Sequence, residues 1–161
     1  MTPPQGITLV LVRHAKSDWG DESLDDHDRP LNERGRRDAP RLAERLASTG
    51  FVPDAILSST ALRARTTADA FAAELGVPVT PDADLYGAPA DTLLSAAAKS
   101  GAAAVLVVAH DPGMSALAER LSGGRIGHMP TCAVATFTWP TDEWDVATAI
   151  DPEDWSFDTP R

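Results

Sequence analysis

The stretch Ile7-Thr8-Leu9-Val10-Leu11-Val12-Arg13-His14 decides the fold, because an apolar, strand-like run leads directly into an arginine and a histidine. A largely continuous apolar run of this length is typical of a parallel strand that is covered on both faces. Arg13 and His14 then follow the carboxyl end of that strand, which is where open α/β sheets bind their ligands. The sequence therefore predicts an α/β protein with a site at this end of the sheet.

Strand-like runs alternate with helical patterns along much of the remaining chain, which is the signature of βαβ units. Further strands are expected at 55–57, 77–80 and 103–108, and helices at 32–50, after the capping turn 58–60 as far as Gly76, at 91–99 and at 114–121. We expect one α/β domain over residues 1–161, a three-layer sandwich whose mainly parallel sheet has helices on both faces.

The C-terminal part is expected to give the sheet an antiparallel edge. Residues 132–139 and 144–150 alternate apolar and polar positions on either side of the turn at 140–142, which favours an antiparallel pair. The polar residues 151–161 are expected to form a loosely held tail outside a core of about 7–150. Residues 16–30 are polar and aperiodic, so they form a long loop beside the predicted site.

Charge and composition exclude several classes of protein. The formal net charge of −10 argues against a nucleic-acid binder or a protein of anionic membrane surfaces, because both need a basic surface. The single cysteine, Cys132, permits no internal disulfide and is expected to be a small buried residue on a strand. Residues 1–6 lack the features of a signal peptide, and no segment approaches the roughly 20 apolar residues of a membrane span. We expect a cytoplasmic monomer with no nucleic-acid or membrane partner.

Arg13, His14, Arg63 and His110 are the candidate catalytic residues. His110 follows the apolar run 103–108, and Arg63 begins the second helix. Because the carboxyl ends of parallel strands meet at one edge of a sheet, these side chains are expected to converge on one cleft. Guanidinium groups bind phosphoryl oxygens two at a time, and a neutral imidazole is a nucleophile near pH 7. The set predicts covalent phosphoryl transfer to His14, with His110 donating to the equatorial oxygens.

Four ordered motifs resemble those of the histidine phosphatase (phosphoglycerate mutase-like) superfamily. They are Leu11-Val12-Arg13-His14-Ala15-Lys16-Ser17, Arg29-Pro30-Leu31-Asn32-Glu33-Arg34-Gly35, Leu57-Ser58-Ser59-Thr60-Ala61-Leu62-Arg63-Ala64-Arg65-Thr66-Thr67-Ala68 and Val108-Ala109-His110-Asp111-Pro112-Gly113. The resemblance implies that His14 is the phosphorylated nucleophile and that Arg13, Arg63 and His110 complete the phosphate pocket. Within the superfamily, the chain looks most like the small SixA-type phosphohistidine phosphatases, because it is short and keeps Asp84-Leu85-Tyr86-Gly87.

The resemblance also bears on the substrate. Mutase and acid-phosphatase branches carry a further acid in insertions that have no equivalent here, and Asp111 is only a partial substitute. An alkoxide leaving group needs the proton of such an acid, whereas the imidazole of phosphohistidine is less demanding. The missing insertion therefore favours phosphohistidine on a protein. The candidate acids are Asp18, Asp25, Asp28 and Asp111.

Lys16, Ser17 and Asp111 are expected to contact the substrate, and His27 and His128 to be ordinary surface residues. No set of His, Cys, Asp and Glu has metal-ligand spacing, and no glycine-rich phosphate loop occurs, so we expect neither metal nor cofactor. Two alternatives remain open. One is the same chemistry on a small phosphomonoester, and the other is a module that binds a phosphorylated partner without turnover.

Overall fold

A six-stranded sheet of order β3-β2-β4-β1-β5-β6 forms the middle layer of the computed structural model, which describes residues 6–160. The strands are β1 (Ile7–Arg13), β2 (Ala55–Ser58), β3 (Val79–Pro81), β4 (Ala104–Ala109), β5 (Val134–Trp139) and β6 (Asp154–Asp158). Strands β1 to β4 are parallel, whereas β5 pairs antiparallel with both β1 and β6. The predicted α/β fold with an antiparallel C-terminal edge is confirmed.

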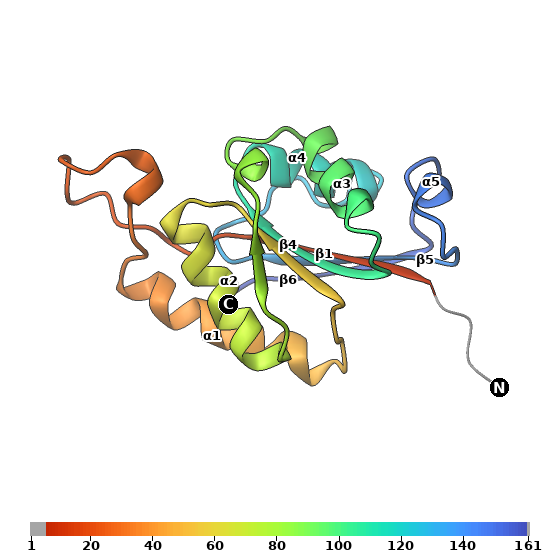
Figure 1. Cartoon of the computed structure of the whole chain (residues 1–161), viewed down its shortest axis with the longest axis horizontal. Helices are drawn as coiled ribbons and strands as arrows, with labels where there is room; N and C mark the ends of the chain where they lie inside the picture. Colours follow the sequence, from red (N-terminus) through yellow and green to blue (C-terminus); the bar gives the residue numbers. More distant parts are fainter. Residues whose placement is uncertain (1–5, 161) are drawn as a thin grey trace.

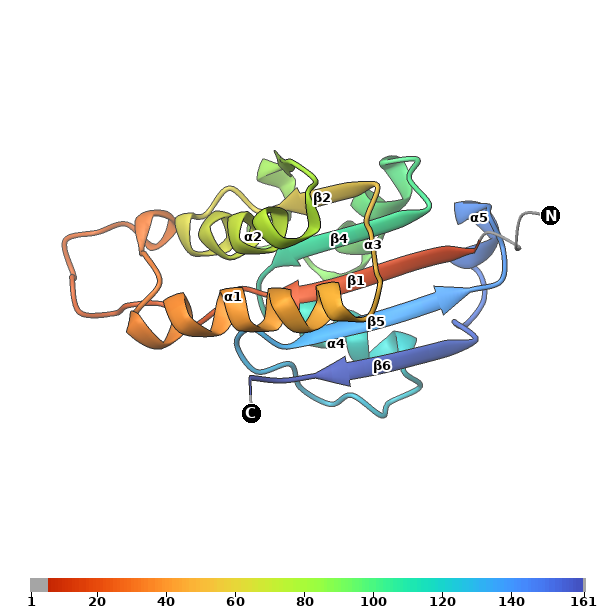
Figure 2. The ribbon, with the colours of Figure 1, turned by 90° about the horizontal axis from the view of Figure 1, so that it is seen from below.

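Helices cover both faces of the sheet (Figure 1). The pair α1 (Glu33–Ser48) and α2 (Leu62–Leu75) lies on one face, and α3 (Ala90–Lys99) and α4 (Gly113–Leu121) lie on the other (Figure 2). Alternate residues of β1 enter two separate cores, with Leu9 and Leu11 on one side and Val10 and Val12 on the other. Because side chains alternate along a strand, burial of both faces explains the continuous apolar run. Among residues 6–160, no helix has the length and apolar character of a membrane span.

The start of α1 is anchored against the segment that follows β1. The side chain of Asn32 caps the helix by accepting from the backbone N–H of Gly35 at 2.8 Å, as its residue type favours. The backbone N–H of Asn32 donates to the carbonyl oxygen of Lys16 at 2.9 Å. A Cβ at Gly35 would lie 2.1 Å from that same oxygen, so only glycine allows the close approach. The helix therefore fixes the backbone two residues beyond His14.

The segment after β5 differs from the prediction. Residues 144–150 were expected to be the strand that pairs with β5, but Trp144–Ala147 form the short helix α5. The indole Nε1 of Trp144 donates to the carbonyl oxygen of Ala102 at 2.8 Å, and its ring lies 6.4 Å from that of Trp139. Trp144 and Ala147 therefore pack against the core from this helix instead of alternating in the sheet, whereas Val146 and Ile150 remain exposed.

The prediction of a loosely held tail is wrong for residues 154–158, which form the edge strand β6 and pair with β5. Trp155 packs against the core beneath α3 and α4. Beyond the strand, the guanidinium of Arg45 in α1 donates to the carboxylate of Asp158 at 3.0 Å and to the carbonyl oxygen of Thr159 at 2.7 Å. The antiparallel edge is thus built from sequence beyond the expected core.

Cys132 is buried, as expected, but it lies ahead of β5 and not on a strand. Its φ of 63° places it in the left-handed region. Burial raises the pKa of its thiol to about 12, and the charges of Asp38 and Asp158 act in the same direction. The thiol is therefore not a nucleophile near neutral pH.

Candidate active site

The carboxyl ends of β1 and β4 bring two histidines side by side. His14 follows β1, His110 follows β4, and their ring centroids are 5.1 Å apart. Arg13 is the last residue of β1, and Arg63 lies in the first turn of α2. All four side chains line one cavity of about 260 Å³. The convergence expected from the strand ends is confirmed.

The ring of His14 is buried and held in one tautomer. Its Nδ1 lies 2.7 Å from the carbonyl oxygen of Ala15, which can only accept, so Nδ1 carries the proton and Nε2 the lone pair. Burial is the largest cause that lowers the pKa of His14 to about 3. His110, Arg63 and Arg13 lower it further, against the opposing effect of the Ala15 hydrogen bond.

His110 is held by a residue that was predicted to have another role. The turn 58–60 was expected to cap α2, but the N-cap is Ala61, and no side chain caps it. The hydroxyl of Ser59 instead lies 2.7 Å from Nε2 of His110. Burial first, and then the charge of Arg63, lowers the pKa of His110 to about 4. The oxygen of the Ser59 hydroxyl accepts from the backbone N–H of Ala61 at 3.3 Å, so its own proton is free for Nε2 of His110. In that tautomer Nδ1 carries a proton that it can donate to a ligand.

Three residues that line this cavity each carry a buried donor with no partner within the described part of the chain. These donors are Nε of Arg13, Nε of Arg63 and Nδ1 of His110. Leaving a buried donor unsatisfied costs about 1–3 kcal/mol, so three of them around one cavity are uncommon. A ligand with several acceptor oxygens, such as a phosphoryl group, would satisfy them together.

Asp26, which the sequence did not identify as a site residue, contacts three residues around the cavity. Its carboxylate accepts from Nη2 of Arg63 at 2.9 Å, from Nη2 of Arg29 at 3.0 Å and from the hydroxyl of Tyr86. The Tyr86 hydrogen bond first, followed by the bonds from Arg63 and Arg29, holds the pKa of the Asp26 carboxyl well below its usual range. The available signal was the spacing of Asp26 and Arg29, three residues apart in an aperiodic loop.

Tyr86 was a second omission, since the sequence supported only its place in a family-like motif. Its ring meets that of His110 edge to face, with centroids 5.4 Å apart. The hydrogen bond to Asp26 raises the pKa of the Tyr86 hydroxyl. The phenol therefore remains protonated and acts as a donor to Asp26.

The three expected substrate contacts all line the cavity. Ser17 is buried and accepts from Nη1 of Arg29 at 2.7 Å, whereas Lys16 is exposed. The carboxylate of Asp111 lies 3.5 Å from Nη1 of Arg13 and accepts from the hydroxyl of Ser115 at 2.8 Å. The cavity thus has a basic, exposed side chain at its rim and fixed polar groups on its wall.

Most of the candidate acids are placed elsewhere. Of the four, only Asp111 lines the cavity, and the other carboxylate in its lining is that of Asp26. The loop 16–30 carries the remaining three beyond the carboxyl ends of the strands, where it projects at the left of Figures 1 and 2. The candidate acids Asp18, Asp25 and Asp28 do not line the cavity. The two histidines that were expected to be ordinary surface residues, His27 and His128, do not line it either.

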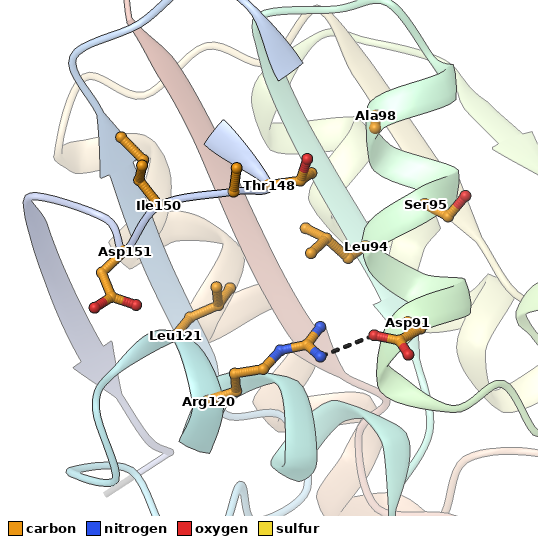
Figure 3. A pocket seen from close by; sticks show the side chains of 10 residues that line it. Asp91, Leu94, Ser95, Ala98, Arg120, Leu121, Thr148, Ile150 and Asp151 are labelled. Carbon is orange, nitrogen blue, oxygen red and sulfur yellow. Dashed lines mark hydrogen bonds and ion pairs between the residues drawn. The ribbon is translucent and has the colours of Figure 1, made fainter. Parts of the chain in front are cut away.

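Another, larger cavity of about 470 Å³ lies away from the histidines, between α3, α4 and the segment after α5 (Figure 3). Arg120 and Asp91 form an ion pair of 2.8 Å across it, and much of its wall is apolar, including Leu94 and Ile150. None of its lining residues is a histidine or a cysteine. The groups suited to nucleophilic chemistry are at the smaller cavity.

We expect the ring signals of His14 and His110 to stay constant between about pH 5 and about pH 8, where a free histidine titrates. The reason is the lowering of their pKa values to about 3 and about 4. Histidine Cε1–Hε1 signals followed by NMR during a pH titration provide the measurement. A midpoint near 6.5 for either ring would contradict the burial argument. Because the unfolded chain binds these protons at higher pH than the folded one, both rings also reduce stability as the pH falls below about 6.5.

The comparisons with known proteins agree with one another. A sequence profile of the histidine phosphatase superfamily (branch 1) matches residues 9–87. An uncharacterised chloroplastic protein of Arabidopsis thaliana is 34% identical over 164 residues, which cover 93% of this chain and 75% of that protein. A crystal structure of SixA from Agrobacterium tumefaciens, assigned as a phosphohistidine phosphatase, has a TM-score of 0.75 at 34% identity, covering 84% of this chain and 92% of its own. A SixA structure from Nakamurella multipartitia, with the same assignment, has a TM-score of 0.86 at 27% identity and covers 99% of both chains.

Proposed function

Because this chain belongs to the histidine phosphatase superfamily, we propose that it is a phosphatase that removes a phosphoryl group from phosphohistidine on a protein. The single observation that carries the proposal is the buried, neutral His14 ring, whose free Nε2 lies in a cavity with unpartnered donors on Arg13, Arg63 and His110. Covalent phosphoryl transfer requires a nucleophile and fixed donors that bind the phosphoryl oxygens, here called the phosphate clamp and formed by Arg13, Arg63 and His110.

The reaction takes place in two displacements at phosphorus. In the first, Nε2 of His14 forms a bond to phosphorus while the bond to the substrate imidazole breaks, and that imidazole leaves with the electron pair and takes up a proton from the solvent. In the second, a water oxygen attacks phosphorus and gives up a proton to the solvent, the bond to Nε2 breaks with its electron pair returning to nitrogen, and inorganic phosphate leaves. His14 regains its lone pair, so the enzyme is unchanged at the end of the cycle.

The surrounding donors stabilise the charge that spreads over the phosphoryl oxygens. The guanidinium groups of Arg13 and Arg63 and the Nδ1 proton of His110 are fixed before the reaction, so little reorganisation is needed. Ser17 and Lys16 extend the set on the loop side, and Asp111 orients Arg13 from the other side. We assign the substrate contacts to these three residues.

The carboxylates in the cavity lining favour an imidazole leaving group. Asp26 is held in its ionised form by Tyr86 and two arginines, so it has no proton to give. Asp111 accepts hydrogen bonds from Ser115. An alkoxide leaves slowly without a general acid, whose contribution is typically about 100-fold to 10,000-fold. The similarity to SixA structures supports the same substrate class.

The experiment compares turnover on three substrates under the same conditions. They are a protein phosphorylated on histidine with phosphoramidate, a phosphoserine peptide and an aryl phosphate. We expect kcat/KM for the phosphohistidine protein to exceed that for the phosphoserine peptide by about 100-fold or more, which is the contribution of the missing acid. Comparable rates on a free sugar or glycerate phosphate would favour the small-molecule alternative. Tight binding of the phosphoprotein without release of phosphate would favour the non-catalytic one.

A further inference from the structure

We propose that Asp26 is a positioning residue, which holds the guanidinium of Arg63 by its two terminal nitrogens and so fixes the direction of the N–H groups that remain for the phosphoryl group. The inference rests on the proposed function of the His14 cavity and extends it to a residue of the acidic loop. It concerns the geometry of the clamp and assigns Asp26 no direct contact with the substrate.

The contacts between the two residues use both terminal nitrogens of Arg63. Its Nη2 donates to Oδ2 of Asp26 at 2.9 Å, and its Nη1 donates to the backbone oxygen of Asp26 at 2.6 Å. Nε is buried and has no partner within residues 6–160. A planar guanidinium that is fixed by one edge has its other edge fixed as well. Asp26 therefore determines the direction in which the remaining Arg63 donors point.

Asp26 is itself held by two further side chains, Arg29 of the same loop and Tyr86. Its Oδ1 accepts from Nε and Nη2 of Arg29 at 3.1 and 3.0 Å, and its Oδ2 accepts from the hydroxyl of Tyr86. Arg29 is fixed in turn, because its Nη1 donates to the hydroxyl of Ser17 at 2.7 Å and its guanidinium stacks on the ring of Trp19 at 3.4 Å. The side chains of Arg29 and Arg63 are only 8% and 7% exposed. Such support is what a precisely aimed binding group requires.

The sign of the effect separates positioning from simple electrostatics. A carboxylate beside an anion site repels the anion, so removal of its charge alone would tighten the binding of phosphate. Loss of positioning would weaken it, because Nη2 of the buried Arg63 loses its carboxylate partner and only the backbone oxygen of residue 26 still holds Nη1. The two accounts therefore predict opposite changes for one substitution.

The decisive variant is Asp26→Asn, with Asp25→Asn as the matched control. Asp25 is the preceding residue, is exposed, and loses the same charge when it is substituted. Binding of inorganic phosphate is measured by calorimetry, together with kcat and KM on the phosphohistidine protein. We expect Asp26→Asn to weaken phosphate binding and to raise KM by about 10-fold, and Asp26→Ala to have the larger effect. Asp25→Asn should stay within about twofold of the parent in both.

Two further variants keep the result interpretable. Tyr86→Phe removes one hydroxyl from a side chain at the surface, so it leaves the fold intact and should weaken phosphate binding in the same direction, by less. In an Arg63→Ala background, Asp26→Asn should no longer weaken phosphate binding, because no guanidinium is left to position and only a repelling charge is removed.

Unchanged or tighter phosphate binding by folded Asp26→Asn would overturn the inference, and so would an equal loss for Asp25→Asn. Phosphate binding requires no turnover. A protein that binds phosphate and responds to Asp26→Asn as described, but releases no phosphate from any substrate, would refute the proposed function while supporting the role of Asp26.

Discussion

Replacement of His14 by asparagine is expected to abolish turnover, with a fall in kcat/KM of about 10,000-fold or more, as for other enzymes that lose their nucleophile. Asparagine retains a donor that can reach the carbonyl oxygen of Ala15, but it offers no lone pair that can attack phosphorus. Binding of phosphate by Arg13, Arg63 and His110 should largely survive. The substitution therefore separates the nucleophile from the clamp.

The intermediate gives a second readout of the same prediction. Incubation with ³²P-labelled phosphohistidine protein, stopped with denaturant at alkaline pH, should leave label on the enzyme that is lost on acid treatment. His14→Asn should carry none of it, whereas His128→Asn, a change at a side chain that is 66% exposed, should be labelled like the parent. Undiminished turnover in His14→Asn, or label that is stable to acid, would refute the covalent mechanism.

Substitution of Arg63 by alanine is expected to lower kcat/KM by about 1,000-fold, the scale on which single fixed donors and arginines contribute to phosphoryl transfer. Arg63 is buried and lines the cavity, its Nε has no partner within the described residues, and its Nη1 and Nη2 donate to Asp26. Its loss removes a donor from the transition state and leaves Asp26 facing the substrate with one positive partner fewer. Both consequences act against a developing negative charge.

Steady-state kinetics of Arg63→Ala and Arg65→Ala give the measurement. Arg65 is exposed on the same helix, so its removal tests the effect of one positive charge on α2 in general. It should change kcat/KM by less than about threefold. Arg63→Lys keeps the charge and loses the planar fork, and we expect it to remain impaired by at least about 10-fold. Equal effects at positions 63 and 65 would show that Arg63 is not part of the phosphate clamp.

The central strands and the candidate catalytic residues could be predicted from the sequence for one physical reason. A parallel strand that is buried on both faces must be apolar throughout, so β1 and β4 could be recognised from local composition. Once their ends are known, the sheet itself brings His14 and His110 together. Arg63 follows from the same rule, because α2 starts beyond the end of β2.

The contacts of Asp26 could not be predicted from the sequence in this way. Its partners Arg63 and Tyr86 lie 37 and 60 residues away and meet it through an irregular loop with no periodic pattern. Loop geometry is set by tertiary contacts, which composition does not encode. Among several neighbouring aspartates, only the spacing of three residues from Arg29 set Asp26 apart from Asp25, and that spacing does not indicate Arg63 or Tyr86.

The C-terminal misassignment has a similar cause. The alternation of residues 144–150 fits a strand, but a four-residue helix places Trp144 against Trp139 and buries Ala147, while Val146 and Ile150 remain exposed. The alternation of Trp155 and Phe157 was a usable strand signal within a polar segment. It became a strand because β5 offered an unpaired edge, which is a property of the assembled sheet.

The outer strands of the sheet are poor templates for another polypeptide. On one side β3 has only three residues and ends at Pro81, which has no N–H to donate. On the other side β6 carries a carboxylate at each end, and Asp158 is tied back to α1 by Arg45. Unprotected strand edges promote aggregation between molecules, and short length, proline and charge are the usual protections. The two lateral edges of the sheet therefore resist pairing with the strands of another molecule.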